Sequence, residues 1–118
     1  MGITTIHARV ANPADISRFA EVEFTVDSGA GYSLVPRSIL QSLGIEPHTT
    51  KHFYLANGES ITRAMGIAVF EYLAERTAAP VIFGEDGDAA LMGATTLEGF
   101  GFVLDPFRRE LRPMPMRL

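Results

Sequence analysis

The residues best suited to chemistry in this sequence are an acid, a hydroxyl and a glycine in direct succession, Asp27, Ser28 and Gly29. They follow residues 20–26, in which apolar and polar residues alternate as in a strand with one buried face. Such a strand would place the carboxylate on a tight loop, where a glycine lets the backbone approach it closely. The same tripeptide also suits an ordinary Asx or Ser turn. Taken alone, it therefore favours a turn without function.

Two further segments make a functional role for Asp27, Ser28 and Gly29 more plausible than a plain turn. Asn57-Gly58 is a strong signal for a β-hairpin turn, and such a hairpin can close over an extended peptide by strand addition or can be a plain surface hairpin. Leu91-Met92-Gly93 places two apolar residues and a glycine before a possible short helical turn at residues 95–99. Chance could produce the weak echo between this segment and the first one, so it does not establish an internal duplication.

In this order and spacing, the three segments resemble the retropepsin-like aspartic proteases, and more narrowly their small bacterial and archaeal members. The family pattern hydrophobic-Asp-Thr/Ser-Gly-Ala is matched by residues 26–30, and the resemblance covers residues 4–113, including a similar tail at residues 102–106 and 111–113. It implies that Asp27 is the catalytic carboxylate and that water is the nucleophile, so neither a cofactor nor a metal is implied. It also implies that Ser28, Gly29, Ala30, Leu91, Met92 and Gly93 support the active loop, and that Leu55, Ala56, Asn57 and Gly58 form a substrate-binding flap. Serine stands where threonine is commoner, but it keeps the hydroxyl that the family uses to brace two active-site loops.

The presence of a single Asp-Ser-Gly has a consequence for assembly. Aspartic proteolysis uses two facing carboxylates that share one proton, because like charges about 3 Å apart cannot both ionise. The other aspartates lack the loop context: Asp15, Asp86, Asp88 and Asp105. The second carboxylate would have to come from Asp27 of another copy across a two-fold axis. We therefore predict a homodimer that cleaves peptide or protein substrates at mildly acidic pH.

The surrounding pattern predicts an all-β fold with little helix, in one domain at residues 1–118. The resemblance specifies a closed or partly open acid-protease β-barrel with one or two short helices. A proline start and Gly44 favour a helix at residues 36–43. Turn signals occur at residues 12–13, 57–58 and 86–88. Strand-like runs lie at residues 4–10, 20–26, 51–55, 67–73, 80–83, 102–104 and 110–112.

Composition narrows the class of protein. The net charge of −4 and the scattered cations argue against a nucleic-acid partner. No run approaches the roughly 20 apolar residues that span a bilayer, so no membrane partner is expected. The N-terminus lacks the pattern of a secretion signal, and the absence of cysteine excludes disulfides and thiol chemistry. We expect a cytoplasmic protein.

Other readings of the chemistry are weaker. His48 and His52 lie four apart, but Pro47 and the strand-like stretch after them argue against a shared helical face for a metal. Residues 86–88 lack the length and terminal glutamate of an EF-hand, and Ser28 and Ser33 have no identifiable base. The main rival is a catalytically inactive peptide-binding or scaffolding domain with the same fold. Two prolines in the tail after Leu111 leave the geometry of the dimer interface open.

Overall fold

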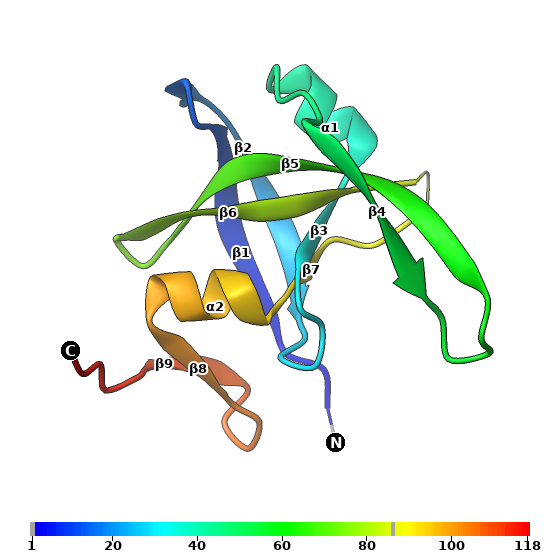
Figure 1. Ribbon diagram of the computed structural model, residues 1–118. Helices are drawn as coiled ribbons and strands as arrows, with labels where there is room; N and C mark the ends of the chain where they lie inside the picture. Colours follow the sequence, from blue (N-terminus) through cyan, green and yellow to red (C-terminus); the bar gives the residue numbers. More distant parts are fainter. Residues whose placement is uncertain (1, 86) are drawn as a thin grey trace.

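The computed structural model describes residues 2–85 and 87–118, and its regular structure is mostly β (Figure 1). The first half contains β1 (Thr5–Asn12), β2 (Asp15–Val26), β3 (Ser33–Pro36), α1 (Arg37–Ser42) and β4 (Thr49–Tyr54). The second half contains β5 (Ser60–Tyr72), β6 (Glu75–Gly84), β7 (Leu91–Met92), α2 (Ala94–Phe100), β8 (Phe102–Asp105) and β9 (Glu110–Pro113). The described part contains no helix that is long and apolar enough to cross a membrane.

The strands curl around a single core. Within the described ranges, seven strands form one sheet in the order β1-β2-β7-β3-β6-β5-β4, and β1 pairs additionally with β5. Most pairs are antiparallel, but β2 runs parallel to β7, and β3 runs parallel to β6. Strands β8 and β9 form a separate hairpin below α2 in Figure 1. The prediction of an all-β, partly open barrel with short helices is confirmed.

Alternation along the strands explains how the core forms. In β2, Val22, Phe24 and Val26 are buried while the residues between them face outward or are half-buried. β1 alternates in the same way, so the paired strands present one apolar face. Phe24 packs against Phe70 of β5 with ring centroids 5.9 Å apart. Burial of each such large side chain stabilises the fold by about 1.5–3 kcal/mol.

The two helices lie close to their predicted positions. Pro36 precedes α1, and Gly44 with φ of +78° follows it, as the sequence pattern indicates. The second helix is longer than the predicted 95–99, because the residue that ends it in the left-handed region is Gly101 rather than Gly99. Gly99 lies inside α2, where a Cβ atom would collide with the side chain of Thr77.

The sheet is more extensive than predicted. β3 and β7 were missed, and β2, β5 and β6 begin at Asp15, Ser60 and Glu75 rather than at residues 20, 67 and 80. The turn between β5 and β6 consists of Leu73 and Ala74, both with positive φ, where Asn-Gly is the usual signal. Of the predicted turn at residues 86–88, Asp86 lies outside the described residues; Asp88 donates its backbone N–H to the carbonyl oxygen of Glu85 at 3.1 Å.

Candidate functional site

Asp27 stands on the loop that follows β2, and local bonds fix its conformation. Its backbone N–H donates to the carbonyl oxygen of Met92 at 2.9 Å, and its own carbonyl accepts the N–H of Ala30 at 3.2 Å. Its carboxylate oxygen Oδ1 accepts the N–H of Gly29 at 2.9 Å. The residue is nevertheless exposed. The loop therefore presents an oriented carboxylate to solvent.

The segment Leu91-Met92-Gly93 lies directly against this loop. Leu91 and Met92 form the short strand β7 rather than a loop, and Met92 pairs with Val26. Beyond β7, the N–H of Ala94 donates to the carbonyl oxygen of Ala30 at 2.7 Å. A Cβ atom on Gly93 would lie 2.9 Å from the same oxygen, and closer still to the carbonyl group of Tyr32. Glycine at position 93 is thus required by the approach of two backbone segments.

A buried pair of hydroxyls joins the loop to α2. The Oγ of Ser33 and the Oγ1 of Thr96 are 2.6 Å apart, and both residues are fully buried. Ser33 Oγ also accepts the N–H of Gly93 at 3.1 Å. From the sequence, Ser33 was considered only as a possible nucleophile, and its partner Thr96, 63 positions away along the chain, was missed. The available signal was the position of Ser33 two residues before Val35 in an apolar run. Residues two apart in a strand lie on the same face, so this spacing indicates a hydroxyl directed into the core.

The predicted flap is the hairpin formed by β4 and β5. The N–H of Leu55 donates to the carbonyl oxygen of Glu59 at 2.7 Å, and Gly58 has φ of +87°, so the predicted Asn57-Gly58 turn is present. Leu55, Ala56, Asn57 and Gly58 are all exposed at the end of this hairpin, which projects from the body of the fold (Figure 1).

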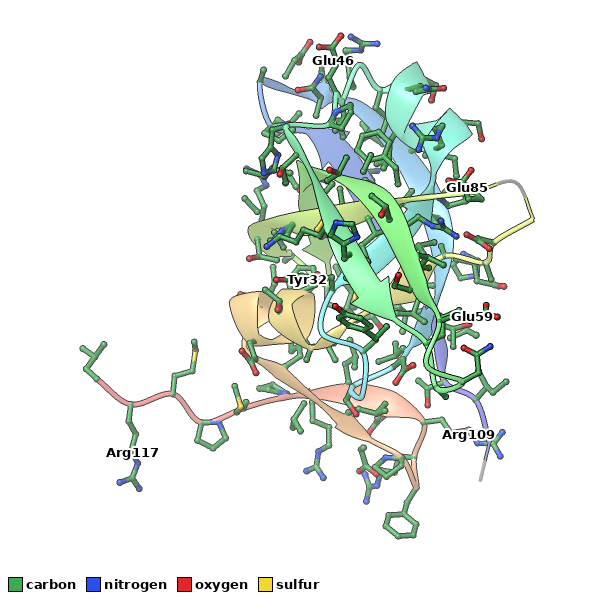
Figure 2. All side chains as sticks on the ribbon, turned by 45° about the vertical axis from the view of Figure 1, so that its right-hand side comes forward. Tyr32, Glu46, Glu59, Glu85, Arg109 and Arg117 are labelled. Carbon is green, nitrogen blue, oxygen red and sulfur yellow. The ribbon has the colours of Figure 1, made fainter. Side chains whose placement is uncertain are left out.

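Tyr32 connects the Asp27 loop with the hairpin. Its ring meets Phe53 of β4 edge-on, with centroids 6.3 Å apart and an interplanar angle of 83°. Figure 2 shows Tyr32 beside β4 and Glu59 by the hairpin turn. Aromatic pairs in this geometry contribute about 0.5–1.5 kcal/mol beyond their buried area. The loop and the hairpin are therefore in contact within one chain.

A hollow of about 310 Å³ is lined by residues of the β4–β5 hairpin, of β3, β6 and β7, and of the segment before β7. Its apolar wall includes Ile61 of the hairpin and Leu91 of β7. Leu91 pairs with Thr25, two residues before Asp27, so one lining residue belongs to the strand next to the end of β2. The full lining is Leu34, Phe53, Ile61, Arg63, Ile82, Asp88, Ala89 and Leu91.

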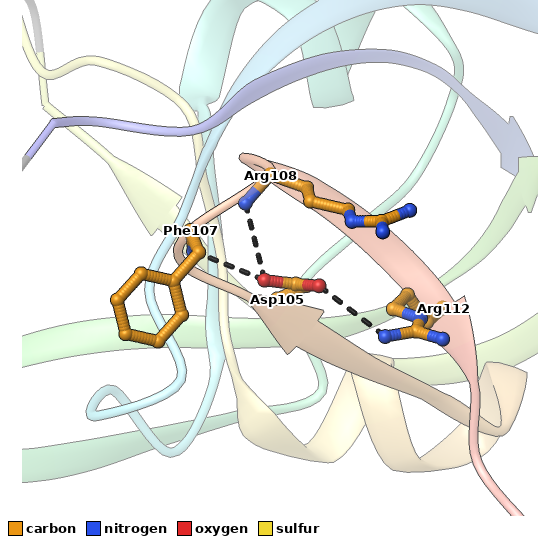
Figure 3. A network of polar contacts seen from close by, with 4 residues as sticks. All are labelled: Asp105, Phe107, Arg108 and Arg112. Atoms are coloured by element: carbon orange, nitrogen blue, oxygen red, sulfur yellow. Dashed lines mark hydrogen bonds and ion pairs between the residues drawn. The ribbon is translucent and has the colours of Figure 1, made fainter.

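The separate β8–β9 hairpin is ordered by Asp105 at its turn (Figure 3). Asp105 Oδ1 accepts the N–H groups of Phe107 and Arg108, at 3.0 and 3.1 Å, and Oδ2 lies 3.4 Å from Nη1 of Arg112. The bond from Arg108 is the main cause that lowers the pKa of Asp105 below its usual value, with smaller contributions from Phe107 and Arg112 that outweigh partial desolvation. The tip carries Phe107, whose side chain is 91% exposed.

A second hollow of about 190 Å³ lies where this hairpin approaches the active loop. It is lined by Ser28 together with Leu97 and Phe102 and their neighbours. The Ser28 side chain makes no hydrogen bond within the described residues, so the structure leaves its hydroxyl available beside an apolar surface.

The histidines lie apart, His7 next to Glu23 and His52 bonded to Thr62. In the parts of the chain that are described, no three His, Cys, Asp or Glu side chains gather in a metal-binding group.

Comparison with known proteins agrees with this geometry. Residues 8–95 match the model of the aspartyl protease family. A retropepsin-like aspartic protease from Rickettsia conorii is 27% identical with a TM-score of 0.64, and the match covers 88% of this chain and 77% of that one. The EIAV protease in complex with an inhibitor has 12% identity and a TM-score of 0.65 over 88% and 93% of the two chains. The Simian Foamy Virus protease has 17% identity and a TM-score of 0.58 over 80% and 91%. Comparison with curated protein sequences gives no match. Since the family model spans well over half of the sequence, the chain belongs to the aspartyl protease family and has the retropepsin-like fold.

Proposed function

We propose that this chain is an aspartic endopeptidase whose active site forms when two copies associate. The observation that carries the proposal is the exposed carboxylate of Asp27, oriented by the N–H of Gly29 on a loop that is bonded to β7 and α2. The sequence has one Asp-Ser-Gly loop, so each copy supplies one carboxylate of the pair.

The proposed chemistry follows from two carboxylates that share one proton. The ionised Asp27 takes a proton from a water molecule, which attacks the scissile carbonyl carbon. The protonated Asp27 of the second copy polarises the carbonyl oxygen, and a proton then passes to the leaving amide nitrogen as the C–N bond breaks. The nucleophile is water, so the proposed reaction requires no cofactor.

Two surfaces support the proposal. The β8–β9 hairpin packs on the body of the fold through the buried Phe102 and Leu111, but it leaves Val103 and Phe107 exposed and adjoins the hollow next to Ser28, so it is the surface that we propose for the second copy. The β4–β5 hairpin can add an extended peptide by strand pairing and exclude water as it closes.

A subunit-mixing experiment tests the proposal. The protein is incubated with a peptide library between pH 4 and 7, and a cleaved peptide is then assayed with wild-type chains mixed with increasing amounts of Asp27→Asn chains. We expect the Asp27→Asn protein alone to be inactive. On mixing, it should reduce the activity per wild-type chain, because a mixed pair contains one ionisable carboxylate where the mechanism needs two. Asp15→Asn, which removes an exposed carboxylate at the β1–β2 turn, serves as the matched control.

Two results would contradict the mechanism. Cleavage that survives Asp27→Asn would remove Asp27 from the chemistry, and full activity per wild-type chain in the mixtures would indicate a monomeric enzyme. Binding of peptides without cleavage at any pH would instead support a peptide-binding or scaffolding domain.

A further inference from the structure

The hollow beneath the β4–β5 hairpin is apolar except for two charged residues. Its apolar lining comes from Leu34, Ile82 and Leu91 on β3, β6 and β7, and from Phe53 and Ile61 on the hairpin. The charged lining residues are Arg63 of β5 and Asp88, in the segment before β7. A purely apolar hollow would accept aliphatic side chains alone, whereas a guanidinium on its wall adds a requirement for charge.

Arg63 is half-buried and has few partners of its own. Its one hydrogen bond within residues 2–85 and 87–118 runs from Nη1 to the neighbouring carbonyl oxygen of Thr62 at a long 3.4 Å. The ion pairs found in the described residues involve Arg9, Arg37, Arg76 and Arg112, but not Arg63. A guanidinium has five N–H donors in a planar fork that matches a carboxylate. Most of that capacity is therefore open toward the hollow or solvent.

Asp88 does not cancel this charge. Its Oδ2 accepts the backbone N–H of Glu85 at 2.8 Å, which turns the carboxylate toward its own turn. Asp88 is exposed, so solvent screens its field more than that of the half-buried Arg63. No ion pair links Arg63 and Asp88 in the described part of the chain.

We propose, resting on the proteolysis proposed above, that Arg63 makes this hollow select an acidic side chain with an aliphatic stem, glutamate, near the scissile bond. The methylene groups of glutamate pack on Leu34 and Leu91, and its carboxylate reaches the guanidinium as a charge-assisted, bidentate pair. Leu91 pairs with Thr25, two residues before Asp27, and on this ground we place the selected residue close to the bond that is cut.

Matched peptides measure this selectivity. Peptides that differ only by Glu, Gln or Lys at positions near the scissile bond are assayed at low salt and pH 6, above the ordinary glutamate pKa of about 4.3. We expect kcat/KM for the best glutamate position to exceed that for glutamine by about tenfold, or roughly 1.4 kcal/mol, and that for lysine by more. Arg63→Met should abolish the difference, Arg63→Lys should retain part of it, and Arg63→Glu should reverse it in favour of lysine. Arg9→Met changes the net charge equally but lies in a different hollow, so it should preserve the preference.

Binding of the same peptides to the Asp27→Asn protein separates failure of this inference from failure of the proposed proteolysis. Glutamate-selective binding that depends on Arg63, without cleavage by the wild type, would overturn the proteolysis and leave the selectivity standing. Equal kinetics and equal binding for Glu and Gln peptides would overturn the selectivity. A glutamate preference that survives Arg63→Met would also overturn it, as would a lysine preference that Asp88→Asn removes. Thermal unfolding of each variant verifies that the hairpin variants are folded.

Discussion

Replacing Ser33 by alanine removes the hydroxyl that joins the Asp27 loop to α2. Ser33 Oγ accepts the N–H of Gly93 and is paired with Thr96 Oγ1, in a place where neither side chain meets solvent. The alanine methyl group occupies nearly the same space as the CH₂OH group it replaces, so the cavity term is small. The change therefore acts through hydrogen bonding.

The magnitude follows from the groups that lose their partner. A buried polar group without a partner costs about 1–3 kcal/mol, and Ser33→Ala affects two such groups. The Thr96 hydroxyl and the backbone N–H of Gly93 both lose Ser33 Oγ as their partner, so we expect a loss of about 2–6 kcal/mol. Thr96→Val leaves the bond to Gly93 in place and should cost less, about 1–2 kcal/mol. Because the two residues share a bond, the double variant should lose less than the sum of the single losses.

Urea unfolding at a fixed protein concentration measures these changes, with all variants in an Asp27→Asn background to prevent self-digestion. Ser60→Ala at the exposed start of β5 is the matched control and should stay within about 0.5 kcal/mol of the parent. If Ser33→Ala were no more destabilising than Ser60→Ala, the hydroxyl pair would not hold the loop. Additive losses in the double variant would show that Ser33 and Thr96 act independently.

Three other changes test separate parts of the structure. Gly93→Ala places a Cβ atom 2.6 Å from the carbonyl carbon of Tyr32, so we expect a loss of several kcal/mol in urea unfolding, on the scale of severe core strain; a loss under 1 kcal/mol would contradict the close approach. Gly58→Ala meets no atom within 4 Å but must hold φ near +87°, at a cost of about 1–2 kcal/mol, so we expect faster amide exchange in the β4–β5 hairpin and a loss of global stability no larger than this cost; unchanged exchange in the hairpin would contradict the strain. Asp105 has a lowered pKa when folded, so its contribution to stability is complete above its ordinary value of 3.8 and disappears as the pH falls through the lower folded pKa. The difference in Tm between wild type and Asp105→Asn should therefore be constant near neutral pH and vanish in strong acid; a difference that persists there would show that the charge is not its origin.

Local patterns in the sequence predicted the elements whose conformation depends mainly on neighbouring residues. Alternation identified β2, proline and glycine located α1, and Asn57-Gly58 located the hairpin turn. β7 has only two residues, too few to show a period, and it exists because it pairs with the end of β2. The turn at Leu73 and Ala74 lacks the usual sequence signal, because the long β5–β6 pairing imposes it.

The candidate site divides in the same way. Asp27, Gly29 and the Leu91-Met92-Gly93 segment were predicted as members, and the structure places them against one another. The hydroxyl pair of Ser33 and Thr96 could not be predicted, since it depends on the approach of two segments far apart in the chain. Arg63 was missed for a related reason: a lone arginine in a polar strand becomes notable only when the hollow that it lines is visible.

In the proposed dimer, the bonds around Asp27 would hold each half of the site in place before the two copies associate. Backbone bonds to Met92, Ala94 and Thr95, together with the bond from the N–H of Gly29 to the Asp27 carboxylate, hold the loop. Asp27 Oδ2 and the Ser28 hydroxyl make no hydrogen bond within the described residues, and in the proposed dimer they are the groups that a facing loop would use. A loop already held in place loses little conformational entropy on association, because its rigidity was established in folding. Ser33→Ala should therefore lower the rate of cleavage even at protein concentrations at which the proposed dimer is fully assembled. The reason is that a misplaced carboxylate slows the chemical step itself.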